Sequence, residues 1–226
     1  MHKYRVLLAA CALATITLVG CHDPTGVPNN RVHAATLDTV VCVVNYSSNL
    51  TGSVSHHVDG QTPGGWYNRS NPYITWGYYW QGMNNHADSC GFAVFDVPEF
   101  SMSSGLPACT LYYYVSEYSG SVDLLVNHIQ DPQSWPGSNQ TLYQAIAAST
   151  DTLAKDGSIT NTGWHKVGLN EQGCGILGSI GAGGGDGTFF TGWKYMETPQ
   201  SGSYAEVTGA DVSLSPYIVV IYEPAP

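Results

Sequence analysis

The sequence predicts an all-β protein, a β-sandwich with one or two short connecting helices. Short segments rich in aromatic and β-branched residues alternate apolar and polar positions, and Pro and Gly residues separate these segments. The clearest stretch runs from Cys90 to Asn127 and contains three such segments in succession. A chain of 226 residues has room for one sandwich domain and an N-terminal extension.

The N-terminus is expected to be an export signal. Two basic residues lie in the first five positions, and the apolar run that follows has the length of a signal peptide. Leu18-Val19-Gly20-Cys21 resembles a bacterial lipobox, and this resemblance implies cleavage before Cys21 and attachment of lipid to its thiol. The alternative is an ordinary secretory signal, with a mature chain that begins at Ala35.

We therefore expect three parts: a lipoprotein signal peptide (1–20), the lipidated Cys21 with a flexible tether (21–36), and a single β-sandwich domain (37–226). Acyl chains anchor a protein because each buried CH₂ contributes about 0.8 kcal/mol. His22 follows the cysteine where a retention signal would have Asp, and the analogy favours the outer membrane. The predicted location is the bacterial cell envelope, either the outer membrane or the cell surface.

The domain is expected to open with two strands. The continuous β-branched run at 37–44 predicts a strand buried on both sides or packed beneath the tether. The segment 53–58 alternates Val and His with Ser and His, which predicts a half-buried strand. Its two histidines, His56 and His57, would point to opposite faces and could not bind one metal ion.

The middle of the domain is expected to hold the central strands. Segment 91–97 has apolar residues on both faces and should be a central strand, in which Asp96 must be hydrogen-bonded or face water. Leu111, Tyr113 and Val115 should share one face of the next strand, and Thr110, Tyr112 and Tyr114 should share the other. After a turn at 118–120, Val122, Leu124 and Val126 should point inward.

The rest of the domain is expected to contain one short helix and four more strands. Thr141 and Gln144 match a capping box, which predicts a helix from 141 to 148. The further strands are expected at 164–169, 188–196, 204–208 and 217–222. The glycine-rich stretch 173–187 is expected to be the loosest part of the domain.

The charge of the chain excludes one class of partner. The formal net charge is −10 and only 11% of residues are charged. Because an acidic protein is repelled by a phosphate backbone, nucleic-acid binding is not expected. Acidic loops could hold structural Ca²⁺, and no other cofactor is expected.

The cysteines support export. Removal of Cys11 with the signal peptide and assignment of Cys21 to lipid leaves an even set without Cys-x-x-Cys spacing: Cys42, Cys90, Cys109 and Cys174. This predicts two disulfides in an oxidising compartment, with three connectivities open. If the strands of Cys90 and Cys109 are antiparallel neighbours, these two residues lie near opposite ends and do not pair.

The order of features from Phe92 to Tyr222 resembles the jelly-roll domains of secreted bacterial and archaeal proteins known as DNRLRE-type domains. The residues that carry the resemblance are Phe95-Asp96-Val97-Pro98, Leu111 to Val115, Asp131-Pro132, Gly163-Trp164 and Ser215 to Tyr222. The motif that names the family is absent. Because these domains are related to carbohydrate-binding modules, the resemblance implies a jelly-roll fold and is compatible with a glycan ligand.

The best candidate for a ligand site is an aromatic cluster. Its members are Trp66, Tyr67, Trp76, Tyr78 and Trp80. Exposed rings of this kind stack on the C–H faces of sugars while nearby amides and carboxylates bind the hydroxyls. The competing interpretation is that these rings fill the core, as aromatic residues commonly do.

Catalytic motifs are absent from the sequence, so the chain is not expected to be an enzyme. It has no G-x-S-x-G or H-E-x-x-H motif, and the glycine pattern at 173–178 lacks a βαβ context. The leading hypothesis is a lipid-anchored surface protein that binds polysaccharide or mediates adhesion. The second is a structural surface or matrix subunit that self-associates. The third is a glycoside-active enzyme that uses two of Asp88, Asp96, Glu99 and Glu117.

Overall fold

The computed structural model describes residues 36–45, 50–59, 61–62, 64–70, 72–82, 85–103, 105–131, 138–184, 187–196, 202–208 and 213–225. Residues 35–226 form one compact unit. The predicted signal peptide, Cys21 and the tether up to residue 35 lie outside the described residues. Neither helix in the described part of the chain is long and apolar enough to cross a lipid bilayer.

Strands dominate the described part of the domain. In chain order the elements are β1 (Asp38–Val44), β2 (Gly52–Val58), β3 (Trp66–Ser70), β4 (Ile74–Gly82), β5 (Asn85–Asp96), β6 (Ala108–Ser119), β7 (Val122–His128), α1 (Asn139–Ala148), β8 (Thr152–Ile159), β9 (Gly163–Gly168), α2 (Glu171–Ser179), β10 (Thr188–Lys194), β11 (Tyr204–Val207) and β12 (Tyr217–Tyr222). The predicted fold class, an all-β sandwich with one or two short helices, is confirmed.

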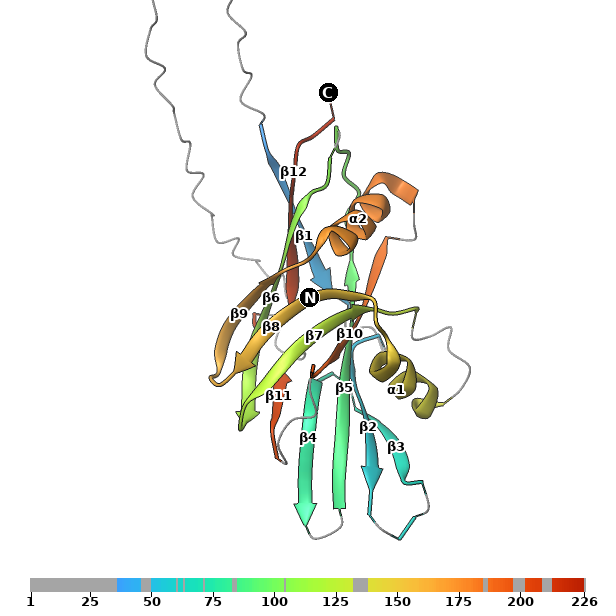
Figure 1. The fold of residues 1–226 in the computed structure, drawn as a ribbon. Coiled ribbons are helices and arrows are strands. Elements are labelled where there is room, and N and C mark those ends of the chain that lie inside the picture. The colour runs from blue at the N-terminus through green and yellow to red at the C-terminus, as the bar shows by residue number, and fades with distance from the viewer. Residues whose placement is uncertain are drawn as a thin grey trace, which may run out of the picture. The chain divides into compact units, whose positions relative to one another are not determined.

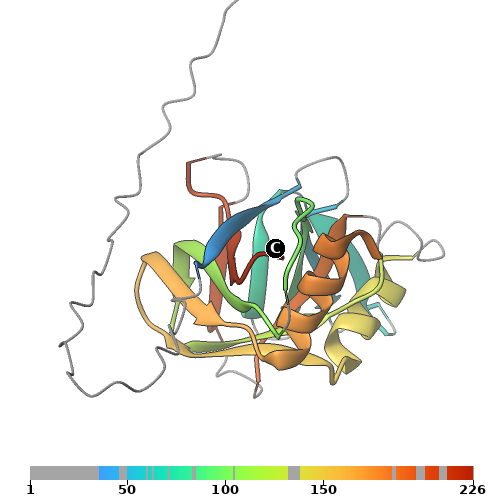
Figure 2. The same cartoon turned by 90° about the horizontal axis from the view of Figure 1, so that it is seen from above.

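The strand β5 organises the sheet. Its first half pairs with β2 and β4, and its second half pairs with β10 and the end of β1, all antiparallel. From β5 the pairings run through β4, β11, β6, β12 and β1 and return to β5, so that these strands close into a ring. Outside this ring, β10 pairs with β5, and β7 and β8 then continue the sheet in that order. Figures 1 and 2 show this arrangement, with β2, β3, β4 and the first half of β5 at one end of the domain.

The main core lies between β7, β8 and β10 on one side and β1, β4, β6, β11 and β12 on the other. At its centre the rings of Trp76, Tyr113 and Trp193 lie within 6.4 Å of one another, centroid to centroid. Each indole N–H has an acceptor, as buried tryptophans require: the carbonyl of Asp123 at 3.1 Å for Trp76, and the hydroxyl of Thr191 at 2.9 Å for Trp193.

The alternations read from the sequence are confirmed along the central strands. Leu111, Tyr113 and Val115 are buried in β6, and Val122, Leu124 and Val126 are buried in β7. The apolar residues on both faces of β5 are buried as well. At the end of that strand, Asp96 accepts a hydrogen bond of 2.8 Å from the amide of Asn45, as expected for a partly buried carboxylate.

A second, smaller core lies beneath α1. It consists of Val54, Cys90, Phe92, Ile129, Leu142 and Ile146. The helix begins at Asn139, because the N-cap residue is Ser138, three positions before the predicted cap Thr141; its side chain accepts a hydrogen bond from the backbone N–H of Thr141. Ser and Thr are both favourable N-cap residues, and the sequence motif alone did not show whether Ser138 or Thr141 caps the helix.

The prediction of a loose glycine-rich stretch is wrong for its first part, which forms α2. Asn170 caps the helix by accepting a 3.0 Å hydrogen bond from the N–H of Gly173. A Cβ at Gly173 or Gly178 would come within 3.2 Å of neighbouring side chains, so these glycines let the helix approach the sheet closely. Packing therefore outweighs the poor helix propensity of glycine. Residues 185–186 lie outside the described residues.

Candidate functional site

The predicted aromatic cluster does not form one surface. Trp76 is fully buried in the main core, so its assignment to a ligand site is wrong. Trp66 and Tyr67 are neighbours in β3 and therefore lie on opposite faces of the sheet. Tyr78 is half-buried and stacks on His86 at 5.1 Å. Trp80 belongs to β4, but its side chain is outside the described residues.

A groove of about 260 Å³ crosses one end of the sheet, on the face opposite α1. The strands beneath it follow one another in the order β3, β2, β5, β4 and β11. Figure 1 shows β2, β3, β4 and β5 side by side at this end. Its described lining is mostly small or polar: Ser53, Ser55, His57, Asn68, Ser70, Tyr73, Thr75, Tyr79, Ala87, Ser89 and Glu206. We call this feature the sheet groove.

Strand register explains the floor of the sheet groove. In the pairing of β2 with β5, Ser55 lies opposite Ser89, and His57 lies opposite Ala87. The two serine hydroxyls hydrogen-bond each other at 2.7 Å. Because small side chains alternate with the apolar ones that pack beneath α1, the floor stays low and presents hydroxyl groups. The alternation of Ser with Val in β2, which the sequence showed, is what creates this polar face.

Aromatic rings border the groove on both sides. On the β3 side the indole of Trp66 does not itself line the groove, but it is 44% exposed and stacks on the lining residue His57, with ring centroids 5.1 Å apart and planes 6° apart. On the β4 side Tyr79 stacks on Tyr204 at 4.1 Å. Three strand spacings separate β3 from β4, which is about 14 Å. Tyr73, in the connection between these strands, is 41% exposed and also lines the groove.

Glu206 gives the groove an acidic edge. In the register of β11 with β6 it lies directly opposite Glu117. Burial and the neighbouring Glu117 carboxylate raise the pKa of Glu206, against a weak 3.5 Å hydrogen bond from Thr75. The Tyr204 hydroxyl donates to Glu117, and this contact is the main reason that the pKa of Tyr204 rises to about 12.

Two further titratable groups that line the groove, His57 and Tyr79, have pKa values shifted toward their neutral forms. Burial, followed by the proximity of His56, lowers the pKa of His57. Burial is also the main cause that raises the pKa of Tyr79, with Tyr204 and Glu206 adding to it. Among the described lining residues there is no Lys or Arg. The sheet groove is therefore neutral to acidic.

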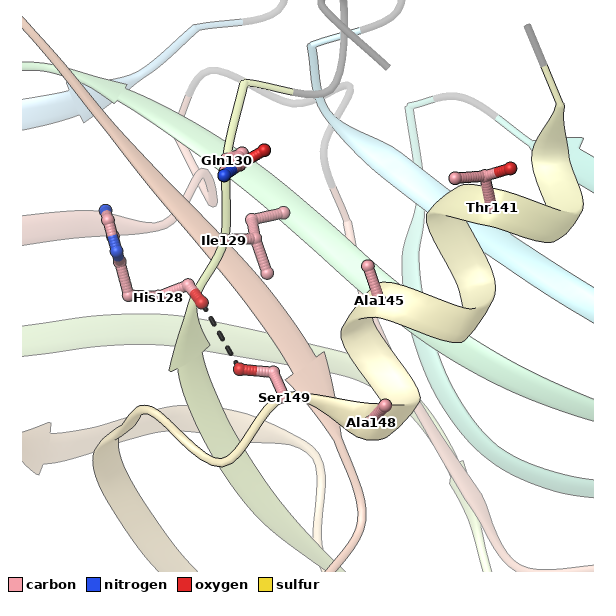
Figure 3. A pocket seen from close by; sticks show the side chains of 7 residues that line it. All are labelled: His128, Ile129, Gln130, Thr141, Ala145, Ala148 and Ser149. Carbon is pink, nitrogen blue, oxygen red and sulfur yellow. Dashed lines mark hydrogen bonds between the residues drawn. The ribbon is translucent and has the colours of Figure 1, made fainter. Parts of the chain in front are cut away.

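A second pocket of about 470 Å³ lies between α1 and the end of β7. Figure 3 shows Thr141, Ala145 and Ala148 along one side of α1, facing the segment that carries Ile129 and Gln130. The Ser149 hydroxyl donates a 3.3 Å hydrogen bond to the carbonyl of His128 at its base. Its described lining offers a mainly apolar surface, and the adjoining residues 132–137 lie outside the described residues.

Asp88 lies on the α1 face of β5, away from the sheet groove. Its Oδ2 accepts hydrogen bonds from the hydroxyls of Tyr143 at 2.6 Å and Tyr195 at 2.7 Å. These contacts attach α1 and the end of β10 to the sheet. The predicted role of Asp88 beside the aromatic cluster, as a partner for sugar hydroxyls or a catalytic acid, does not match this position.

In this structure the four cysteines of the domain are buried free thiols, and neither of the two predicted disulfides is present in it. Cys90 belongs to the cluster beneath α1, whereas Cys42, Cys109 and Cys174 belong to the main core. The fold therefore keeps Cys90 apart from the other three. The premise used against a Cys90–Cys109 bond was also wrong, because β4 and β11 lie between β5 and β6 in the sheet.

The described ranges show no candidate metal site. They contain no group of three or more His, Cys, Asp or Glu side chains placed to hold a metal ion. His56 and His57 lie on opposite faces of β2, as predicted from their spacing: His56 stacks on Tyr67, and His57 stacks on Trp66.

No protein-family model matches this sequence, and no curated protein is significantly similar to it.

Proposed function

We propose that this chain is an exported, lipid-anchored protein of the bacterial cell surface that binds a polysaccharide in the sheet groove. The observation that carries the binding proposal is the polar, serine-lined floor of the groove, with the exposed Tyr73 ring and the Tyr79–Tyr204 stack on its border and the exposed indole of Trp66 stacked on the lining residue His57. The anchor rests on the lipobox sequence that ends at Cys21.

The groove matches the two chemical needs of a sugar ligand. Pyranose rings have apolar C–H faces that pack on aromatic rings, and their hydroxyls need hydrogen-bonding partners when water leaves. Trp66 and Tyr73 can supply the first, and the partly exposed Ser55 and the exposed Asn68 can supply the second.

The acidic edge of the groove makes some classes of polysaccharide better ligands than others. Glu206 and Glu117 lie side by side at one edge, and the described lining has no cation to offset them. Because like charges repel, a polyuronate or sulfated chain is disfavoured. We therefore expect a neutral or amino-substituted glycan as the ligand.

Replacement of Trp66 by Ala is expected to weaken polysaccharide binding by about 5- to 30-fold. Loss of one stacked aromatic face removes about 1–2 kcal/mol of contact, and 1.4 kcal/mol corresponds to a factor of ten. Affinity electrophoresis of the purified protein in gels that contain neutral, amino-substituted or acidic polysaccharides measures the effect.

Trp164→Ala provides a matched control for this experiment. Trp164 is 47% exposed on β9 and does not line the sheet groove. The proposal expects Trp164→Ala to bind as the wild type does. Equal loss of binding in both variants, or loss only in Trp164→Ala, would place the ligand outside the groove.

Replacement of Glu206 by Gln is expected to raise the melting temperature at neutral pH. Since the folded-state pKa of Glu206 is raised, ionisation costs stability as pH rises from the unfolded value of about 4.3 through the folded pKa. The variant escapes this cost, and the gain should vanish below pH about 4. Thermal melts from acidic to neutral pH measure it, with the exposed Glu99→Gln as control. A constant difference at every pH contradicts the assignment.

The second candidate function is a self-associating structural subunit. Exposed apolar side chains gather on β1, β12 and β9, namely Val41, Val43, Ile221 and Trp164. Tyr112 and Tyr217 stack between them across β6 and β12 at 4.9 Å. In the electrophoresis experiment, failure to bind any polysaccharide combined with concentration-dependent assembly would favour this alternative.

A further inference from the structure

Two cysteines lie close together between β6 and α2. Cys109 and Cys174 are 4% and 5% exposed, both belong to the main core, and each shifts the pKa of the other. They come from distant parts of the sequence, because β7, α1, β8 and β9 lie between them along the chain. Their contact is therefore a product of the tertiary fold.

Leu169 hydrogen-bonds to both cysteines. Its N–H donates to the carbonyl of Cys109 at 2.9 Å, and its carbonyl accepts from the thiol of Cys174 at 3.6 Å. The N–H of Cys174 also donates to the carbonyl of Asn170 at 3.0 Å, in the first turn of α2. Both cysteines are thus fixed by the end of β9 and the start of α2.

The surroundings distinguish the two thiols chemically. Hydrogen bonding from Cys109 lowers the pKa of Cys174 to about 7 and raises the pKa of Cys109 itself. Burial raises the pKa of Cys42 to about 12. Because the thiolate is the nucleophile, Cys174 reacts first and Cys42 is the less reactive thiol of the same core.

We propose that Cys109 and Cys174 form a disulfide bond that ties α2 to β6 when the protein meets an oxidising compartment, while Cys42 and Cys90 remain thiols. The oxidant is a disulfide, either of a protein or of a small molecule. The Cys174 thiolate attacks one sulfur of this disulfide, the S–S bond breaks, and the other sulfur leaves as a thiolate.

Cys109 completes the exchange. Its thiol loses a proton, and the resulting thiolate attacks the Cys174 sulfur of the mixed disulfide and releases the second sulfur of the oxidant. In total two thiols lose two electrons and two protons, and the oxidant disulfide becomes two thiols. Burial of the pair requires α2 to lift transiently during the first attack, and the finished bond prevents that movement.

Peptide mapping of the full chain tests this inference. The purified protein is equilibrated in a buffer of oxidised and reduced glutathione, alkylated in denaturant and digested without reduction. The expected product is a Cys109–Cys174 linked peptide, with Cys42 and Cys90 alkylated. Alkylation of all four cysteines, or a Cys42–Cys109 linkage, would overturn it.

Variants add an independent readout. Reduction with dithiothreitol should lower the melting temperature of the wild type and of Cys90→Ser by the same amount, and should leave Cys174→Ser unchanged. Cys90 is the matched control because it is equally buried in a different cluster. An equal effect of reduction on Cys174→Ser and the wild type would show that the bond lies elsewhere.

Discussion

Replacement of Trp76 by Ala is expected to lower the free energy of unfolding by about 3–5 kcal/mol, the usual cost of removing a buried tryptophan. The indole is fully buried and contacts the rings of Tyr113 and Trp193 in the main core. Its removal also leaves the carbonyl of Asp123 without the hydrogen bond that the indole N–H supplies. Urea-induced unfolding followed by circular dichroism measures this loss.

Trp66→Ala is the matched comparison, because it removes the same kind of side chain from β3. This strand belongs to the same sheet and is separated from β5 by β2. The Trp66 indole is 44% exposed, so we expect a loss of stability below about 1 kcal/mol, as for other surface substitutions. The two variants should therefore separate stability from binding. A similar loss of stability in both variants would contradict the difference in burial, namely that Trp76 is buried and Trp66 is exposed.

Replacement of Gly77 by Ala should be the second large effect, and it also bears on the groove. Gly77 adopts φ of +126°, and a Cβ there would lie 2.5 Å from the carbonyl oxygen of Ser203. The backbone conformation costs a side chain about 1–3 kcal/mol. The close contact adds about 1–3 kcal/mol, because β11 must move away from β4.

Two other glycines separate these contributions. Gly202 has φ of +87° with open space around its Cα, so Gly202→Ala should show only the backbone cost. Gly157 has open space and no such φ, so Gly157→Ala should be close to neutral. Urea unfolding of the three variants should rank them Gly77, Gly202 and Gly157 in order of decreasing loss. An equal loss for Gly77→Ala and Gly202→Ala would contradict the contact with β11.

The sequence predicted most strands of the core because their signals are local. Alternation in 111–115 and 122–126, and the apolar faces of 91–97, survive in the structure because each of these strands packs on the main core. By contrast, β8 carries Lys155, Asp156 and Gly157 within a strand, and only its pairing with β7 makes it one. Such elements depend on neighbours that are distant in sequence.

The candidate site was predictable only in part. Trp66 was singled out and does border the groove, but composition could not distinguish it from Trp76. The distinction depends on the tertiary fold: in β4, Tyr79 shares with Thr75 the face that lines the groove, and Trp76 lies on the opposite face, against the main core. Glu206 was missed because its partner, Glu117, lies on another strand and only the register of β11 with β6 joins them.

The central claim is that the sheet groove binds a polysaccharide, and an NMR titration tests it most directly. The isotope-labelled protein is titrated with soluble oligosaccharides from the neutral or amino-substituted polysaccharide retained in electrophoresis. The account predicts concentration-dependent shifts of the Trp66 indole N–H and of the backbone amides of Ser55 and Ser89, with the Trp164 indole unchanged. Shifts confined to Trp164 and its neighbours, or no shift with any glycan of the panel, would contradict it.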